Sequence, residues 1–138
     1  MNYTPINTEE SFKRIQEGAI VIDVRYPKEH NMIRIENSHN IPFKEITVEK
    51  INSINPDNKD IIIHCTAGIT SKKVADYLVS EGYQGSIYEM DKGLIDWINL
   101  GFKTLTISII LIKEKIMVIK LKFFTFQFLN ASKKSSFF

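Results

Sequence analysis

The sequence predicts an α/β domain in which a central parallel sheet is flanked by helices on both faces. Two runs, residues 19–24 and 60–64, are continuously apolar and rich in β-branched residues, which is typical of strands covered on both sides. Segments with helical periodicity alternate with these runs, and this alternation is the pattern of β-α-β units. A third short strand is predicted at residues 86–90. In such a fold we expect ligands to bind beyond the carboxyl ends of the strands.

Helices are predicted between and after these strands. The first begins with Thr8 as its N-cap and ends near Gly18. A weakly helical stretch covers residues 46–54, and a stronger amphipathic helix covers residues 71–81. The last helix of this part is predicted at residues 94–100 and ends at a glycine.

Length, charge and cysteine content limit the possible classes of protein. The chain has 138 residues, enough for one ordinary domain, and its net charge of +2 is too small to indicate a nucleic-acid partner. Its one cysteine cannot form an internal disulfide, and residues 1–10 lack the apolar stretch of a signal peptide. We therefore expect a cytoplasmic protein.

The pattern changes from Leu105 onward. Two apolar runs, residues 106–112 and 116–129, surround the charged residues 113–115, which is compatible with a β-hairpin. Charged residues interrupt the stretch, which argues against a membrane helix, and no membrane partner is expected. Residues 130–136 have the composition of a disordered polar tail. The expected organisation is thus a domain at residues 1–104 and an atypical extension at residues 105–138.

Cys65 is the main candidate for a chemical role. It falls between the strand at 60–64 and the helix at 71–81, where free backbone N–H groups favour an anion and lower a thiol pKa. Gly68 suits a loop that curls tightly around such a centre. The alternative is that Cys65 is a buried structural thiol, as lone cysteines in reducing compartments usually are.

Three segments of the chain carry motifs that occur in a fixed order. The first is residues 22–29, Ile-Asp-Val-Arg-Tyr-Pro-Lys-Glu, which closes at Asn-Ile-Pro in 40–42. The second is residues 65–71, Cys-Thr-Ala-Gly-Ile-Thr-Ser, with the helix behind it. The third is residues 90–97, Met-Asp-Lys-Gly-Leu-Ile-Asp-Trp, followed by Gly-Phe in 101–102. Together these three segments resemble the signatures of rhodanese domains, and three landmarks in the same order are more specific than one.

The resemblance covers about residues 5–104 and implies the rhodanese-like fold. No cofactor is expected, and no metal is assigned because one cysteine and isolated loop histidines form no ligand cluster of recognisable spacing. It implies a sulfurtransferase in which catalytic Cys65 carries sulfane sulfur as a persulfide, between a donor such as thiosulfate or a protein persulfide and a thiol acceptor. By the same resemblance Asp23 orients the loop or Arg25, which faces the site. The remaining substrate-binding residues that it implies are Thr66, Ala67, Gly68, Ile69, Thr70 and Ser71.

The chain departs from the family pattern where an anionic donor would bind. Members with clear thiosulfate activity usually have a basic residue after the cysteine and an arginine at the position of Thr70, whereas Thr66 and Thr70 are neutral. Residues 33–38 also replace the usual Gly-His-Ile-Pro-Gly-Ala stretch, and Arg34 could supply a replacement cation. The identity of the substrate therefore stays open.

Other assignments remain alternatives. Asp23 and Arg25 are two residues apart in a strand and could simply form a local salt bridge. His64 should point to the face opposite Cys65, which disfavours a cysteine–histidine pair. A rhodanese-like phosphatase would need an arginine where Ser71 stands. A non-catalytic or regulatory module that carries sulfur or binds a ligand is the other alternative, and turnover of thiosulfate discriminates it from an enzyme.

Overall fold

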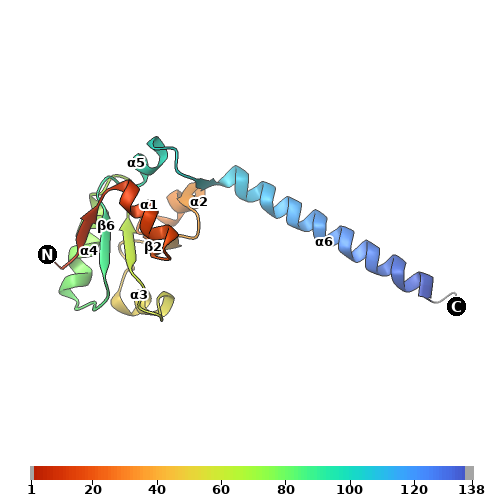
Figure 1. Ribbon diagram of the computed structural model, residues 1–138, viewed down its shortest axis with the longest axis horizontal. Helices are drawn as coiled ribbons and strands as arrows, with labels where there is room; N and C mark the ends of the chain where they lie inside the picture. Colours follow the sequence, from red (N-terminus) through yellow and green to blue (C-terminus); the bar gives the residue numbers. More distant parts are fainter. Residues whose placement is uncertain (1, 136–138) are drawn as a thin grey trace. The chain divides into compact units, whose positions relative to one another are not determined.

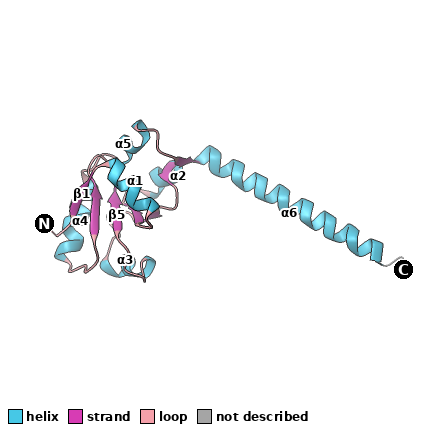
Figure 2. Cartoon of the chain, in the orientation of Figure 1, coloured by secondary structure: helices cyan, strands magenta, loops and turns pink. Residues whose placement is uncertain are grey.

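The computed structural model describes residues 2–135 and divides the chain into two compact units, residues 1–105 and 106–138. The first unit contains a parallel sheet of five strands in the order β1-β6-β5-β2-β4 (Figures 1 and 2). These strands are β1 (Thr4–Ile6), β2 (Ile20–Asp23), β4 (His39–Asn40), β5 (Ile61–His64) and β6 (Ile87–Met90). A separate two-stranded sheet pairs β3 (Ile33–Ile35) with β7 (Thr104–Thr106).

Five helices accompany the sheet in the first unit. They are α1 (Thr8–Gln16), α2 (Pro27–Met32), α3 (Val48–Ile54), α4 (Thr70–Ser80) and α5 (Gly93–Asn99). The connection between β2 and β4 contains α2 and β3.

Alternating side chains of the strands divide the apolar core into two layers. Ile61 and Ile63 of β5 pack in one cluster with Val74 and Leu78 of α4. Ile62, between them, belongs to the other cluster, which contains Leu94 and Trp97 of α5 and residues of α1. Side chains of a strand alternate between faces, so α3 and α4 cover one face while α1 and α5 cover the other. The predicted fold class is confirmed.

The start of α1 differs from the prediction. Asn7, not Thr8, is the N-cap, and its side-chain oxygen accepts a hydrogen bond from the Glu10 N–H at 2.8 Å. Thr8 is buried, and its hydroxyl donates to Asp96 Oδ2 at 2.6 Å, which joins α1 to α5. Both residue types are good N-caps. The tertiary hydrogen bond to Asp96 explains why Thr8 lies one position inside the helix.

The expected hairpin in the second unit is wrong. From Ile107 to Ser135 the chain forms the single helix α6. No glycine or proline interrupts residues 107–135, and a charged turn without such residues cannot readily reverse a hairpin. Residues 130–135 of the expected disordered tail belong to this helix, and residue 136 lies outside the described residues. Within residues 2–135, no helix combines the length and the apolar character needed to cross a bilayer.

Candidate functional site around Cys65

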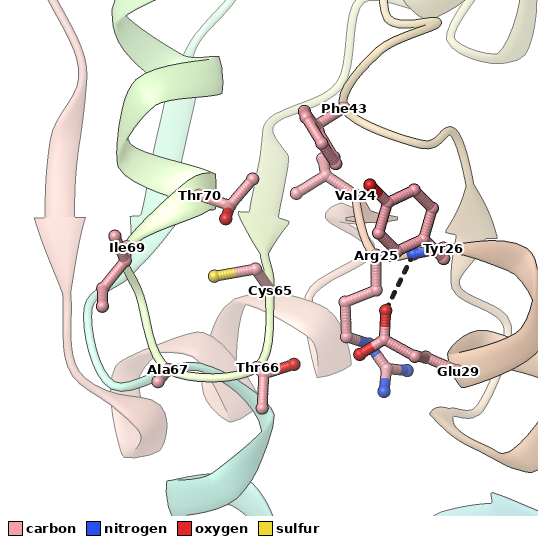
Figure 3. Close-up of a pocket in the computed structure, with 10 residues that line it drawn as sticks. All are labelled: Val24, Arg25, Tyr26, Glu29, Phe43, Cys65, Thr66, Ala67, Ile69 and Thr70. Atoms are coloured by element: carbon pink, nitrogen blue, oxygen red, sulfur yellow. Dashed lines mark hydrogen bonds between the residues drawn. The ribbon is translucent and has the colours of Figure 1, made fainter.

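Cys65 follows β5 directly, at the carboxyl end of a central strand (Figure 3). The chain turns through residues 66–69 before α4 begins at Thr70, and the sulfur points toward this turn. The Gly68 N–H donates to Cys65 Sγ at 3.2 Å, and the Ser71 hydroxyl oxygen lies 3.3 Å from the same sulfur. The sulfur therefore lies among donors that stabilise an anion.

Two opposing effects act on the pKa of the Cys65 thiol. The residue is only 5% exposed, and burial raises the pKa because it disfavours the charged thiolate. Hydrogen bonds from the Ser71 hydroxyl and from the backbone N–H groups of Ser71, Ala67 and Gly68 lower the pKa. The hydrogen bonds outweigh burial, so the pKa lies below its ordinary value, in the direction that a nucleophilic thiol requires.

Two glycines allow the start of α5 to pack closely against the loop that follows Cys65. Gly68 has a φ of +81°, and a Cβ there would overlap the carbonyl oxygen of Asp91. Gly93 has a φ of +62°, and a Cβ there would meet the Cys65 carbonyl oxygen at 2.7 Å. At the start of α5, the Leu94 N–H donates to that Cys65 oxygen at 2.9 Å. The second and third signatures of the sequence are thus in direct contact and together fix the loop.

A cavity of about 220 Å³ opens beside Cys65 (Figure 3). Its lining residues are Val24, Arg25, Tyr26, Glu29, Phe43, Cys65, Thr66, Ala67, Ile69 and Thr70. Among them, in the part of the chain that the structure describes, Arg25 is the only cation and Glu29 the only anion. The cavity is thus mainly apolar, with neutral threonines near the sulfur.

Arg25 lines this cavity while its guanidinium is held by Asp23. Arg25 Nη2 donates to Asp23 Oδ2 at 2.7 Å and to the Ile33 carbonyl oxygen at 2.6 Å, and Nε donates to Asp23 Oδ1 at 3.0 Å. His30 Nδ1 lies 2.9 Å from Asp23 Oδ2. Arg25 thus forms the local salt bridge with Asp23 and also lies at the site. The Asp23 carboxylate orients the guanidinium of Arg25.

The electrostatics of this cluster fix Asp23 as an anion. Burial alone would raise the pKa of Asp23, but hydrogen bonds from His30 and Arg25 lower it well below its ordinary value. His64 points away from the thiol, as predicted: its Nδ1 lies 3.2 Å from the Cys65 carbonyl oxygen and its Nε2 lies 3.9 Å from Asp23 Oδ2. Burial is the main cause of the lowered pKa of His64, so the neutral ring is favoured.

The structure brings most of the predicted site residues together, but not all in the same way. Thr66, Ala67, Ile69 and Thr70 line the cavity, and Gly68 and Ser71 contact the sulfur from within the fold. Arg34 lies in β3 and is not among the lining residues.

Two buried residues near the site were not predicted. His30 binds Asp23, and Glu89 of β6 accepts a hydrogen bond from Ser71 at 2.6 Å. Glu89 could have been noticed because it stands two residues after Ile87, on the face where a buried strand normally has an apolar side chain. Within residues 2–135, no cluster of three or more histidine, cysteine or carboxylate side chains has an arrangement that could hold a metal.

Comparisons with known proteins agree with this fold. The rhodanese-like domain model matches residues 8–100. The thiosulfate sulfurtransferase GlpE of Haemophilus influenzae is 25% identical over 103 residues, which cover 70% of this chain and 90% of that protein. A sulfurtransferase of Allochromatium vinosum is 28% identical over 98 residues, covering 70% of this chain and 89% of the relative.

A solved structure shares the same architecture. The crystal structure of a rhodanese-related protein from Thermoplasma volcanium aligns with a TM-score of 0.63 and 28% identity. The alignment covers 75% of this chain and 98% of that protein.

Proposed function

Since the chain belongs to the rhodanese-like domain family, we propose that it is a sulfurtransferase that carries sulfane sulfur as a persulfide on Cys65. The observation that carries this proposal is the placement of the Cys65 sulfur at the start of α4, where the Gly68 N–H donates to it and a cavity opens beside it. Those donors stabilise a thiolate before the reaction and the persulfide anion after it.

The reaction consists of two displacements at sulfur. The Cys65 thiolate attacks the sulfane sulfur of the donor, a new S–S bond forms, and the bond between that sulfur and the rest of the donor breaks. The bonding electron pair leaves with the donor, as sulfite from thiosulfate or as a thiolate from a persulfide. An acceptor thiolate then attacks the outer sulfur, and Cys65 returns as a thiolate. The reaction needs no cofactor.

The charges around the cavity favour a persulfide donor over thiosulfate. Thr66 and Thr70 are neutral, and the guanidinium of Arg25 already binds Asp23. Glu29 adds a negative charge to the lining, which opposes a dianion. A protein or low-molecular-weight persulfide carries less charge, so we infer that it is the better donor and that a thiol is the acceptor.

A non-catalytic or regulatory module that carries sulfur is the second candidate, because among the described lining residues Arg25 is the one cation and it already binds Asp23. The phosphatase alternative has less support. Ser71 stands where an arginine would be needed, and it is buried and bound to Glu89, so it cannot hold a phosphate by two parallel contacts.

Intact-mass measurement after incubation with thiosulfate or with a persulfide donor tests the proposal. We expect wild type to gain one sulfur atom, more completely from the persulfide, and the Cys65→Ser protein to gain none. Subsequent loss of this sulfur to cyanide or to a thiol, over many turnovers, distinguishes an enzyme from a carrier. Wild type that gains no sulfur from either donor would contradict the proposed function.

A further inference from the structure

A buried carboxylate lies behind the cysteine loop, and Ser71 joins it to the thiol. Glu89 is 2% exposed and pairs in register with Ile63 of β5, so it points to the face of the sheet that α4 covers. The Ser71 hydroxyl donates to Glu89 Oε1 at 2.6 Å. Ser71 Oγ also lies 3.3 Å from Cys65 Sγ. The three side chains form a continuous line of hydrogen bonds from the thiol to the carboxylate.

The single proton of the Ser71 hydroxyl gives this line two possible directions. When Ser71 donates to the Glu89 carboxylate, its oxygen accepts from the Cys65 S–H. When Cys65 is a thiolate, the anion is best stabilised if Ser71 donates to it, and then Ser71 can only accept from Glu89. Glu89 can donate only if it is protonated. The geometry therefore couples the protonation of the thiol to that of the carboxylate.

We propose that Cys65, Ser71 and Glu89 form a proton relay in which Glu89 takes up the thiol proton through Ser71. Glu89 contacts Ser71 and not the reacting sulfur, so it acts as a positioning residue for the proton. The role of this relay in sulfur transfer rests on the function proposed above, whereas the sharing of a proton between thiol and carboxylate does not.

The proton transfer balances without any further reactant. The thiol proton moves to Ser71 Oγ while the hydroxyl proton moves to Glu89 Oε1, and the electron pair of the S–H bond stays on Sγ. This pair forms the new bond to the sulfane sulfur of the donor. After the acceptor removes the outer sulfur, Sγ again holds the pair, and Glu89 returns the proton through Ser71.

The surroundings of Glu89 make it a suitable acceptor. Burial is the main cause that raises the pKa of Glu89, the Ser71 hydrogen bond opposes it, and the exposed carboxylates of Asp91 and Asp76 raise it further. The charge of Lys72 lowers the pKa of Glu89. The pKa of the Cys65 thiol is shifted downward, so the two values move toward each other. The charged or titratable groups that face Glu89 are Tyr3 before β1, Lys72 and Asp76 on α4, and Asp91 after β6.

Histidine, the usual base for a cysteine, is not placed for this task here. Within residues 2–135, the hydrogen-bond partners of the Cys65 sulfur are the Gly68 N–H and the Ser71 hydroxyl. His64 lies on the other side of the strand with its Nε2 near Asp23. Glu89 is thus the titratable side chain that the described hydrogen bonds connect to the thiol.

The rate of alkylation of the thiol by iodoacetamide, measured against pH, tests the relay in the full-length protein without any sulfur donor. Two groups whose interaction exceeds about one pK unit lose their protons in two macroscopic steps that belong to the pair. We expect two steps in wild type and one step, between those two, in Glu89→Gln, because glutamine can donate to Ser71 but cannot take up a proton. Ser71→Ala should lose the acidic step.

Asp76→Asn is the matched control, since it removes a carboxylate that acts on Glu89 only through space, and it should keep two steps. A single step in wild type, or two steps that persist in Glu89→Gln, would overturn the relay. If Glu89→Gln does not fold, a Ser71→Ala profile identical to that of wild type would overturn it. Because alkylation reports only the thiol, a failure of the relay is separate from a failure to gain sulfur in the mass measurement.

Discussion

Asp23 and Glu89 are both buried carboxylates in strands of the same sheet, but their environments differ. Asp23 accepts hydrogen bonds from Arg25 and His30, and its pKa is lowered although burial acts to raise it. Glu89 accepts from the neutral hydroxyl of Ser71, and burial raises its pKa. Burial acts on both in the same direction, so the charge of the partner decides the outcome.

This difference assigns the two carboxylates different tasks. Asp23 stays ionised and keeps Arg25 at the wall of the cavity, so its contribution is to structure. Glu89 is the carboxylate whose pKa is raised by burial, which favours uptake of a proton, and it lies on the face of the sheet toward which Cys65 points. The chain thus holds a fixed anion on one side of the site and a titratable one on the other.

The largest effect on stability is expected from Asp23→Asn. This change leaves the guanidinium of Arg25 buried without its anion, and breaking a buried ion pair in this way costs about 3–5 kcal/mol. Glu89→Gln, the matched change on the other face, keeps a hydrogen-bonding group for Ser71 and should cost about 1 kcal/mol. Urea unfolding at neutral pH measures both. Equal losses in the free energy of unfolding would show that the two carboxylates contribute equally to stability, which would contradict this prediction.

A smaller effect is expected from adding a cation on the side of the cavity that lacks one. Thr70→Arg should increase kcat/KM for thiosulfate about ten- to a hundredfold, because one charge-assisted contact contributes roughly 1.5–3 kcal/mol. Thr70→Gln is the control for side-chain length without charge. If the two variants have equal activity with thiosulfate, the loop does not bind this anion.

The strands and the cysteine loop could be predicted because their signals are local. The β-branched runs that became β2 and β5, and the helical spacing after Thr70, depend only on neighbouring residues. The strands β1 and β4 were missed because they have three and two residues, too few for a periodic pattern. Their pairing is set by the rest of the sheet.

Glu89 and His30 could not be assigned because their roles depend on distant contacts. A carboxylate in a short strand looks the same in sequence whether it faces water or a buried hydroxyl. Only the register of β6 against β5 and the packing of α4 bring Glu89 to Ser71. The hairpin prediction was wrong for a local reason. The apolar residues of α6 follow no single periodicity, so the absence of glycine and proline was the more informative signal.

The pH dependence of stability should separate the two carboxylates by sign. The lowered pKa of Asp23 gives stability that is present above its unfolded pKa of about 3.9 and is lost as pH falls through the folded value. The raised pKa of Glu89 gives a contribution that is present below its unfolded pKa of about 4.3 and is lost as pH rises through the folded value. Glu89→Gln should remove the loss of stability at rising pH and leave the loss at falling pH, which belongs to Asp23. Urea unfolding from about pH 3 to about pH 8 measures this, and an unchanged profile in Glu89→Gln would contradict it.

The smallest effect is expected from removal of α6. Both carboxylates, both apolar clusters and the cysteine loop belong to residues 1–105. The described apolar side chains of α6 are largely exposed, Phe124 to 69%, so deleting them removes little buried surface. A chain ending at Thr106, which keeps β7, should unfold cooperatively with a free energy within about 0.5 kcal/mol of the full chain. It should also keep the two-step alkylation profile, because the Cys65–Glu89 line lies wholly within the retained residues. Loss of cooperative unfolding on truncation would mean that α6 is required for the fold that holds the two carboxylates in place.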